Sequence, residues 1–236
     1  GRVEYTFFNK LVLSDLLIKD QNSDTLLWSS RISAGILRLD IAGKNIRLGR
    51  VDIERPVIAF ITDTTGLMNL TWYLDMLKNP LDTVKKESLR FFVNRITIND
   101  GRFALLNRKG PPGKALLDFR NLHLSDLNAD VKNLRVRGDS TVLEINDVRF
   151  GESKGFHVRS MKSDLTLARK EILFGDLFMN LDSSIINAEQ VLLSGHESEG
   201  FRNFNENVRL DIRLEKSLVS ASDLRYFLSA AGGLNE

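Results

Sequence analysis

One short pattern recurs along this chain: two alternating apolar residues, two polar residues, and two more alternating apolar residues. The clearest copies are residues 11–18 (LVLSDLLI), 46–53 (IRLGRVDI), 122–129 (LHLSDLNA) and 143–150 (LEINDVRF). Alternation with a period of two gives a β-strand one apolar face and one polar face. A helical pattern of comparable strength is found in only two short stretches, so the sequence predicts a mainly β fold.

The polar pair inside each copy shifts the alternation by one residue. The strand can turn back there as a hairpin, or it can bulge and restore its apolar face. Long bulged strands are the preferred interpretation, because Ser-Asp and Asn-Asp lack the glycine that tight hairpin turns favour. At Asn99-Asp100-Gly101 a turn and a bulge are equally compatible with the sequence. Stronger turn signals, where hairpins are expected, lie at residues 20–24, 63–66, 107–114 and 151–155.

Two short amphipathic helices are predicted. The first is capped by Asn69 and ended by Asn79-Pro80, and the second runs from Ser222 or Asp223 to Gly232-Gly233. Both are interpreted as packing helices, since an apolar helix face usually contacts a protein core. Trp72 and Tyr73 leave a membrane-interface role open for the first helix.

Composition narrows the class of protein. The 236 residues are 42% hydrophobic and 27% charged, and we expect one elongated β-rich domain over 1–236, with a subdivision near 80–90 as the alternative. The net charge is only +2 and the basic residues are scattered, so nucleic acid is not an expected partner. Apolar runs are shorter than the roughly 18 residues of a membrane span. The start at Gly1 suggests a fragment of a longer chain, whose anchor lies outside it.

No catalytic or metal site is expected. The chain has no cysteine, and its three histidines, His123, His157 and His196, are far apart in sequence. Asp52 and Glu54 share a strand face, where adjacent exposed charges are commoner than a glycosidase acid pair. The aspartates that recur within the repeat, Asp100, Asp126 and Asp147, suit backbone hydrogen bonding at turns or bulges. We therefore expect a non-enzymatic protein without a cofactor.

Several short segments follow one another in a familiar order: residues 96–103 (ITINDGRF), 155–158 (GFHV), 165–167 (LTL), 183–186 (SSII) and 220–227 (SASDLRYF). Together they resemble the AsmA-like family, most closely its TamB branch in Bacteroidetes-type bacteria, from about Phe8 to the end of the chain. That family also has an amino-terminal inner-membrane helix and a carboxy-terminal domain, neither of which occurs here. The resemblance implies an elongated, half-open, curved β-sheet, called a β-taco, with an apolar concave face.

The resemblance further implies a periplasmic bridge, anchored in the inner membrane, whose apolar groove conducts phospholipid between the inner and outer membranes. An outer-membrane barrel protein of the TamA/BamA type is an implied partner. The alternatives are a β-rich scaffold for outer-membrane protein assembly and a surface adhesion or binding module. The residues expected to contact acyl chains are the alternating apolar ones of the repeat: Leu11, Leu13, Ile46, Leu48, Ile96, Ile98, Leu122, Leu124, Leu143 and Ile145.

Overall fold

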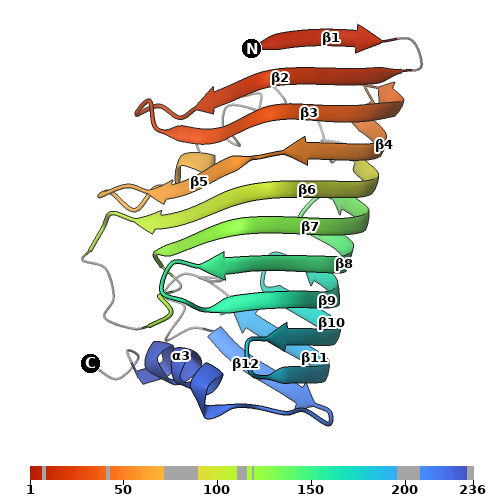
Figure 1. The fold of residues 1–236 in the computed structure, drawn as a ribbon. Coiled ribbons are helices and arrows are strands. Elements are labelled where there is room, and N and C mark those ends of the chain that lie inside the picture. The colour runs from red at the N-terminus through yellow and green to blue at the C-terminus, as the bar shows by residue number, and fades with distance from the viewer. Residues whose placement is uncertain are drawn as a thin grey trace.

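The computed structural model describes residues 1–6, 9–40, 43–71, 90–110, 116–118, 120–195 and 208–232. Within these ranges the protein is mainly β, as predicted, and a single curved sheet contains all the strands (Figure 1). The strands are β1 (Arg2–Thr6), β2 (Lys10–Lys19), β3 (Thr25–Asp40), β4 (Asn45–Glu54), β5 (Val57–Thr62), β6 (Arg90–Asn107), β7 (Leu122–Arg137), β8 (Ser140–Glu152), β9 (His157–Leu167), β10 (Glu171–Leu181), β11 (Ile185–Gly195) and β12 (Val208–Leu214). Helix α3 (Ala221–Gly232) lies near β12 at one end of the sheet (Figure 1).

The strands follow one another across the sheet almost in chain order, and neighbours are antiparallel except at one seam. There β4 and β5 both run parallel to β6. These two strands are halves of one interrupted strand, because Glu54 pairs with Asn99 and Val57 pairs with Arg102. The interruption is Arg55-Pro56, where Arg55 has a φ of 47° and proline has no N–H to offer the ladder.

The long strands bulge, as preferred from the sequence. Asp100, Asp126 and Asp176 have left-handed φ values of 52°, 53° and 47° inside β6, β7 and β10. The pairing register shifts beside each of them. Aspartate tolerates this conformation better than most side chains. Asn99-Asp100-Gly101 is therefore a bulge within β6 and not a turn.

The turn signals have mixed outcomes. Residues 20–24 and 151–155 connect β2 to β3 and β8 to β9, as predicted. Residues 63–66 form a turn that leads to Met68, which pairs with Thr62. A turn also begins at 108–110, whereas 111–114 lie outside the described residues.

The second predicted helix is confirmed as α3. The chain is helical at 69–71, where the first was expected, and the rest of that prediction lies outside the described residues. Asn69 does not act as the expected cap. Its amide instead accepts the Ile61 N–H (3.0 Å) and donates to the Ala59 carbonyl (3.0 Å), so it extends the hydrogen-bond ladder of β5. No described helix is long and apolar enough to cross a membrane.

Two small clusters hold many of the buried apolar side chains. The first cluster centres on Ala34, Val51 and Val93, on β3, β4 and β6. The second lies where α3 meets the sheet, and consists of Leu117, Phe156, Val158, Leu181 and Tyr226. The molecule exposes 15306 Å² to solvent, against about 10,700 Å² for a compact monomer of this length. The sheet therefore leaves much of its surface uncovered.

Candidate functional site

A continuous row of apolar side chains crosses the sheet from β2 to β11. Residues that pair across neighbouring strands lie on the same face, so the pairing register traces this row strand by strand. Its members are Leu13, Ile32, Ile53, Ile98, Ala129, Val148, Met161, Met179 and Ile186. The apolar residues of one strand thus pair with apolar residues of the next, and together they give the sheet one apolar face.

Further rows lie beside it on the same face. The next row contains Leu11, Ala34, Val51, Ile96, Val131 and Ile145. A third, near the strand ends, contains Leu39, Ile46, Phe91, Val136, Thr141, Leu167, Ile172, Leu193 and Leu210. Only Thr141 interrupts the apolar character of these two rows.

The first row is less buried than the second, whose members Ala34, Val51 and Ile145 are each 8% exposed. Every member of the first row is half-buried, and none is fully covered. In a closed β-sandwich the inward side chains of one sheet interdigitate with those of a second sheet. Here the described strands belong to one sheet, so the apolar face has no second sheet opposite it. Within the described residues, this face is covered in part, where its side chains pack against the two buried clusters.

All ten residues proposed from the sequence lie on this face. The pairings and the two clusters place Leu11, Leu13, Ile46, Leu48, Ile96, Ile98, Leu122, Leu124, Leu143 and Ile145 there. Nine are half-buried, whereas Ile145 is only 8% exposed. Contact of these residues with lipid remains a prediction. Of the first row, only Leu13 and Ile98 are among these ten. Sequence reasoning missed its other members, which are Ile32, Ile53, Ala129, Val148, Met161, Met179 and Ile186.

Helix α3 covers one end of the apolar face. Tyr226 packs on Phe156 with ring centroids 5.4 Å apart, and Met161, Met179 and Ile186 pack against the same cluster. The helix is fixed by Asp223, whose carboxylate accepts the backbone N–H of Ser183 at 2.9 Å. The open part of the face is therefore bounded on the β12 side by this helix.

The opposite face carries charged ladders. Arg95 donates two hydrogen bonds to Asp130, at 2.7 and 2.8 Å, and these bonds lower the pKa of the Asp130 carboxyl. Asp52 accepts hydrogen bonds from Thr97 and Arg50. Although burial raises the pKa of Asp52, these bonds outweigh it and leave the pKa lowered. Asp52 and Glu54 both line a shallow hollow of about 300 Å³ with the basic residues Lys10, Arg31 and Arg50. In this hollow Asp52 is ion-paired with Arg50, and Glu54 accepts a hydrogen bond from Asn99.

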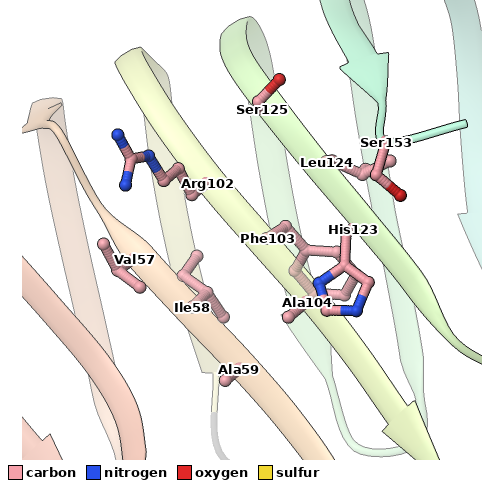
Figure 2. Close-up of a pocket in the computed structure, with 10 residues that line it drawn as sticks. All are labelled: Val57, Ile58, Ala59, Arg102, Phe103, Ala104, His123, Leu124, Ser125 and Ser153. Atoms are coloured by element: carbon pink, nitrogen blue, oxygen red, sulfur yellow. The ribbon is translucent and has the colours of Figure 1, made fainter. Parts of the chain in front are cut away.

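A shallow depression of about 320 Å³ lies over β5, β6 and β7 (Figure 2). Ala59 pairs with Ala104, and Ala104 pairs with His123, so small side chains leave this hollow on the outer face. His123 is exposed, as expected from its place in the repeat. The ten lining residues are Val57, Ile58, Ala59, Arg102, Phe103, Ala104, His123, Leu124, Ser125 and Ser153.

Metal-binding side chains do not converge in the described part of the chain. His157 Nδ1 lies 2.8 Å from Asp182, which also binds Arg159, and this exposed group joins β9 to the turn after β10. No set of three or more His, Asp or Glu residues among those described is placed to hold a metal ion. The apolar face is thus the most extensive feature to which a function can be attached.

The chain matches no protein-family model, and the search of curated proteins found no match to it.

Proposed function

We propose that the apolar face of the sheet binds the acyl chains of phospholipids, as a lipid-conducting segment of a bridge between two membranes. The observation that carries this proposal is the first row, which is apolar on each of the nine strands that it crosses, β2–β4 and β6–β11, and half-buried throughout. Lipid conduction needs no unique chemical group, and a uniform row of this kind suits it. The half-open β-taco with its apolar face on the concave side belongs to the same proposal.

Energetics support a continuous apolar path. Moving the acyl chains of a phospholipid from a bilayer into water has an unfavourable transfer free energy of about 0.8 kcal/mol per methylene. For roughly 30 methylenes this amounts to about 20 kcal/mol. A row without polar interruption offsets this cost at each position along the sheet. The row has one member on each of nine strands, β2–β4 and β6–β11. Its eight strand spacings of about 4.8 Å give it a length of about 38 Å.

The periplasm as location, an inner-membrane anchor outside this segment, and a barrel partner of the TamA/BamA type are part of the same proposal. They come from the family resemblance alone. A scaffold for outer-membrane protein assembly or an adhesion module would use the same strands without bound lipid.

Mass spectrometry of lipid extracted from the purified protein tests the acyl-chain site. We expect phospholipid in the native protein and a several-fold lower content in Leu124→Asp, because a carboxylate on the apolar face must be desolvated beside acyl chains. His123→Asp is the matched control, since it adds the same charge to the next residue on the opposite face. Absence of phospholipid from the native protein, or equal loss in both variants, would contradict the proposal.

A further inference from the structure

Four exposed arginines gather on the outer face at the ends of three neighbouring strands. They are Arg47 on β4, Arg90 on β6, and Arg135 and Arg137 on β7. Arg90 pairs directly with Arg137 across the ladder, and Arg47 and Arg135 are the two cross-strand neighbours of Phe92. We call these four residues the arginine patch.

Like charges directly opposite one another destabilise a sheet. In the arginine patch no carboxylate of a described residue neutralises these charges. Within the described residues, none of its four side chains forms an ion pair with a carboxylate. Arg50 on β4 and Arg95 on β6 are paired, with Asp52 and Asp130 respectively, whereas Arg102 on β6 forms no ion pair with a described residue. The patch therefore concentrates positive charge that stability of the sheet does not require.

Phe92 holds part of the patch in place. The guanidinium of Arg47 lies 5.4 Å from the centre of the Phe92 ring, and that of Arg135 lies 5.7 Å from it. Contacts at this distance are favourable cation–π interactions. They fix two guanidinium groups beside one aromatic ring while leaving both arginines exposed. Guanidinium groups held in this way are suited to phosphate oxygens, which they can bind in a bidentate manner.

Apolar side chains border the arginine patch on the same strand ends. Ile46, Phe91 and Val136 alternate with the arginines and belong to a row of the apolar face. Leu39, which pairs with Ile46, is 55% exposed, and nearby Leu37 is 62% exposed. Exposed leucines beside arginines suit the boundary between lipid headgroups and acyl chains, where both kinds of side chain are accommodated.

We propose that the arginine patch binds the phosphate groups of anionic phospholipids at a bilayer surface, with Leu37 and Leu39 contacting the acyl boundary. This inference goes beyond the acyl-chain site, because it concerns the outer face and would hold even if the apolar face carried no lipid. It assigns the edge formed by these strand ends as the part of the segment that meets a membrane.

Vesicle flotation tests the inference with the protein as it stands. We compare vesicles of phosphatidylcholine alone with vesicles that also contain phosphatidylglycerol. The protein is expected to float with the anionic vesicles and to be released as salt is raised from about 0.1 to 0.5 M, because screening shortens the range of these interactions. Arg90→Gln/Arg137→Gln should reduce partitioning by about 25-fold, at about fivefold for each basic residue near an anionic surface.

The matched control is Arg102→Gln/Arg149→Gln, which removes two exposed arginines from other positions of the outer face. It should change partitioning by less than about threefold, since these charges lie away from the proposed contact. Equal loss in the two double variants, or equal binding of the native protein to both kinds of vesicle, would overturn the inference. If inorganic phosphate at low millimolar concentration displaces the protein at constant ionic strength, the patch is a small-anion site and the membrane assignment is wrong.

Two further readouts separate failure of this inference from misfolding and from failure of the acyl-chain proposal. Thermal unfolding of Arg90→Gln/Arg137→Gln should occur at or above the native temperature, because the substitution removes a like-charge pair. Lipid extracted from this variant should equal that of the native protein, since the apolar face is unchanged. A destabilised variant would contradict the argument that the pair is not needed for folding.

Discussion

The side chain of Asn69 forms hydrogen bonds with backbone groups of β5 that, within the described part of the chain, have no partner strand at that position. Asn69 is 2% exposed and supplies both an acceptor and a donor to β5, while its amide also donates to Asp20 at 3.2 Å. The sequence indicates asparagine as a helix cap but contains no sign of these partners, which are 8 to 49 residues away.

Of the recurring aspartates, Asp100 and Asp126 occupy bulges as expected, whereas Asp147 has no left-handed φ. The carboxylates of Asp126 and Asp147 accept hydrogen bonds from the hydroxyls of Ser125 and Ser160 instead of from the backbone.

At the residue scale, the ion pair between Asp130 and Arg95 predicts a pH dependence of stability. The pKa of Asp130 is lowered in the folded protein, chiefly by hydrogen bonds from Arg95. The ionised Asp130 carboxylate therefore stabilises the folded state at neutral pH. This contribution is lost as pH falls below the ordinary pKa of an aspartate and through the lowered pKa of Asp130. Asp130→Asn should cost about 1 kcal/mol at pH 7 and much less at pH 3.

Urea unfolding at the two pH values measures this difference. Asp164→Asn is a suitable control, because Asp164 is exposed on the neighbouring part of the sheet and forms no ion pair with another described residue. A cost of Asp130→Asn that stayed constant between pH 7 and pH 3 would contradict the assignment.

At the scale of the element, the bulges explain how long strands keep one apolar face. The alternation in the sequence indicated many of the strands and the bulges at Asp100 and Asp126, but not the one at Asp176. It could not establish strand partners, because every copy of the pattern has the same faces and similar length. The parallel pairing of β4 and β5 with β6 was therefore not predicted, and neither was the interruption at Arg55-Pro56. At Asn99-Asp100-Gly101 the choice of a bulge depends on the partner strand β7, which local sequence does not identify.

The left-handed backbone at Asp126 predicts opposite effects for two substitutions. With a φ of 53°, this position suits glycine and disfavours a β-branched residue by about 1 to 2 kcal/mol. Asp126→Gly should therefore change stability little, whereas Asp126→Val should destabilise the protein. Chemical denaturation checks both, with Asp164→Val as a control at a strand position of ordinary φ, where valine is well tolerated. Destabilisation of equal size at 126 and 164 would show that the backbone conformation is not the cause.

At the scale of the whole molecule, one sheet presents an apolar face on one side and charged ladders on the other. The mainly β class, the bulged strands and the common face of the ten candidate residues followed from the alternation alone. The cover provided by α3 did not, because it depends on contacts between Tyr226 and the turn before β9. The arginine patch was missed as well, since its residues come from three strands and appear scattered in the sequence.

An uncovered apolar face predicts dye binding by the native state. After delipidation the folded protein should enhance the fluorescence of 1-anilinonaphthalene-8-sulfonate, because exposed apolar surface binds this dye. Enhancement should fall when Ile98 and Val148, two half-buried members of the first row, are both replaced by aspartate. Thr97→Asp/Arg149→Asp supplies the control on the outer face. Native near-ultraviolet circular dichroism must persist throughout, and weak dye binding by the delipidated native protein would indicate that the face is closed.

The parallel seam between β4, β5 and β6 also has a consequence for the order of folding. On either side of it, each strand pairs with its neighbour in the chain, and such local pairings close short loops at a small cost in entropy. The seam instead joins strands separated by residues 63–89, so its formation closes a much longer loop. We therefore expect two ribbons of hairpins to form early and independently, and their junction at the seam to be the late step that creates one uninterrupted sheet.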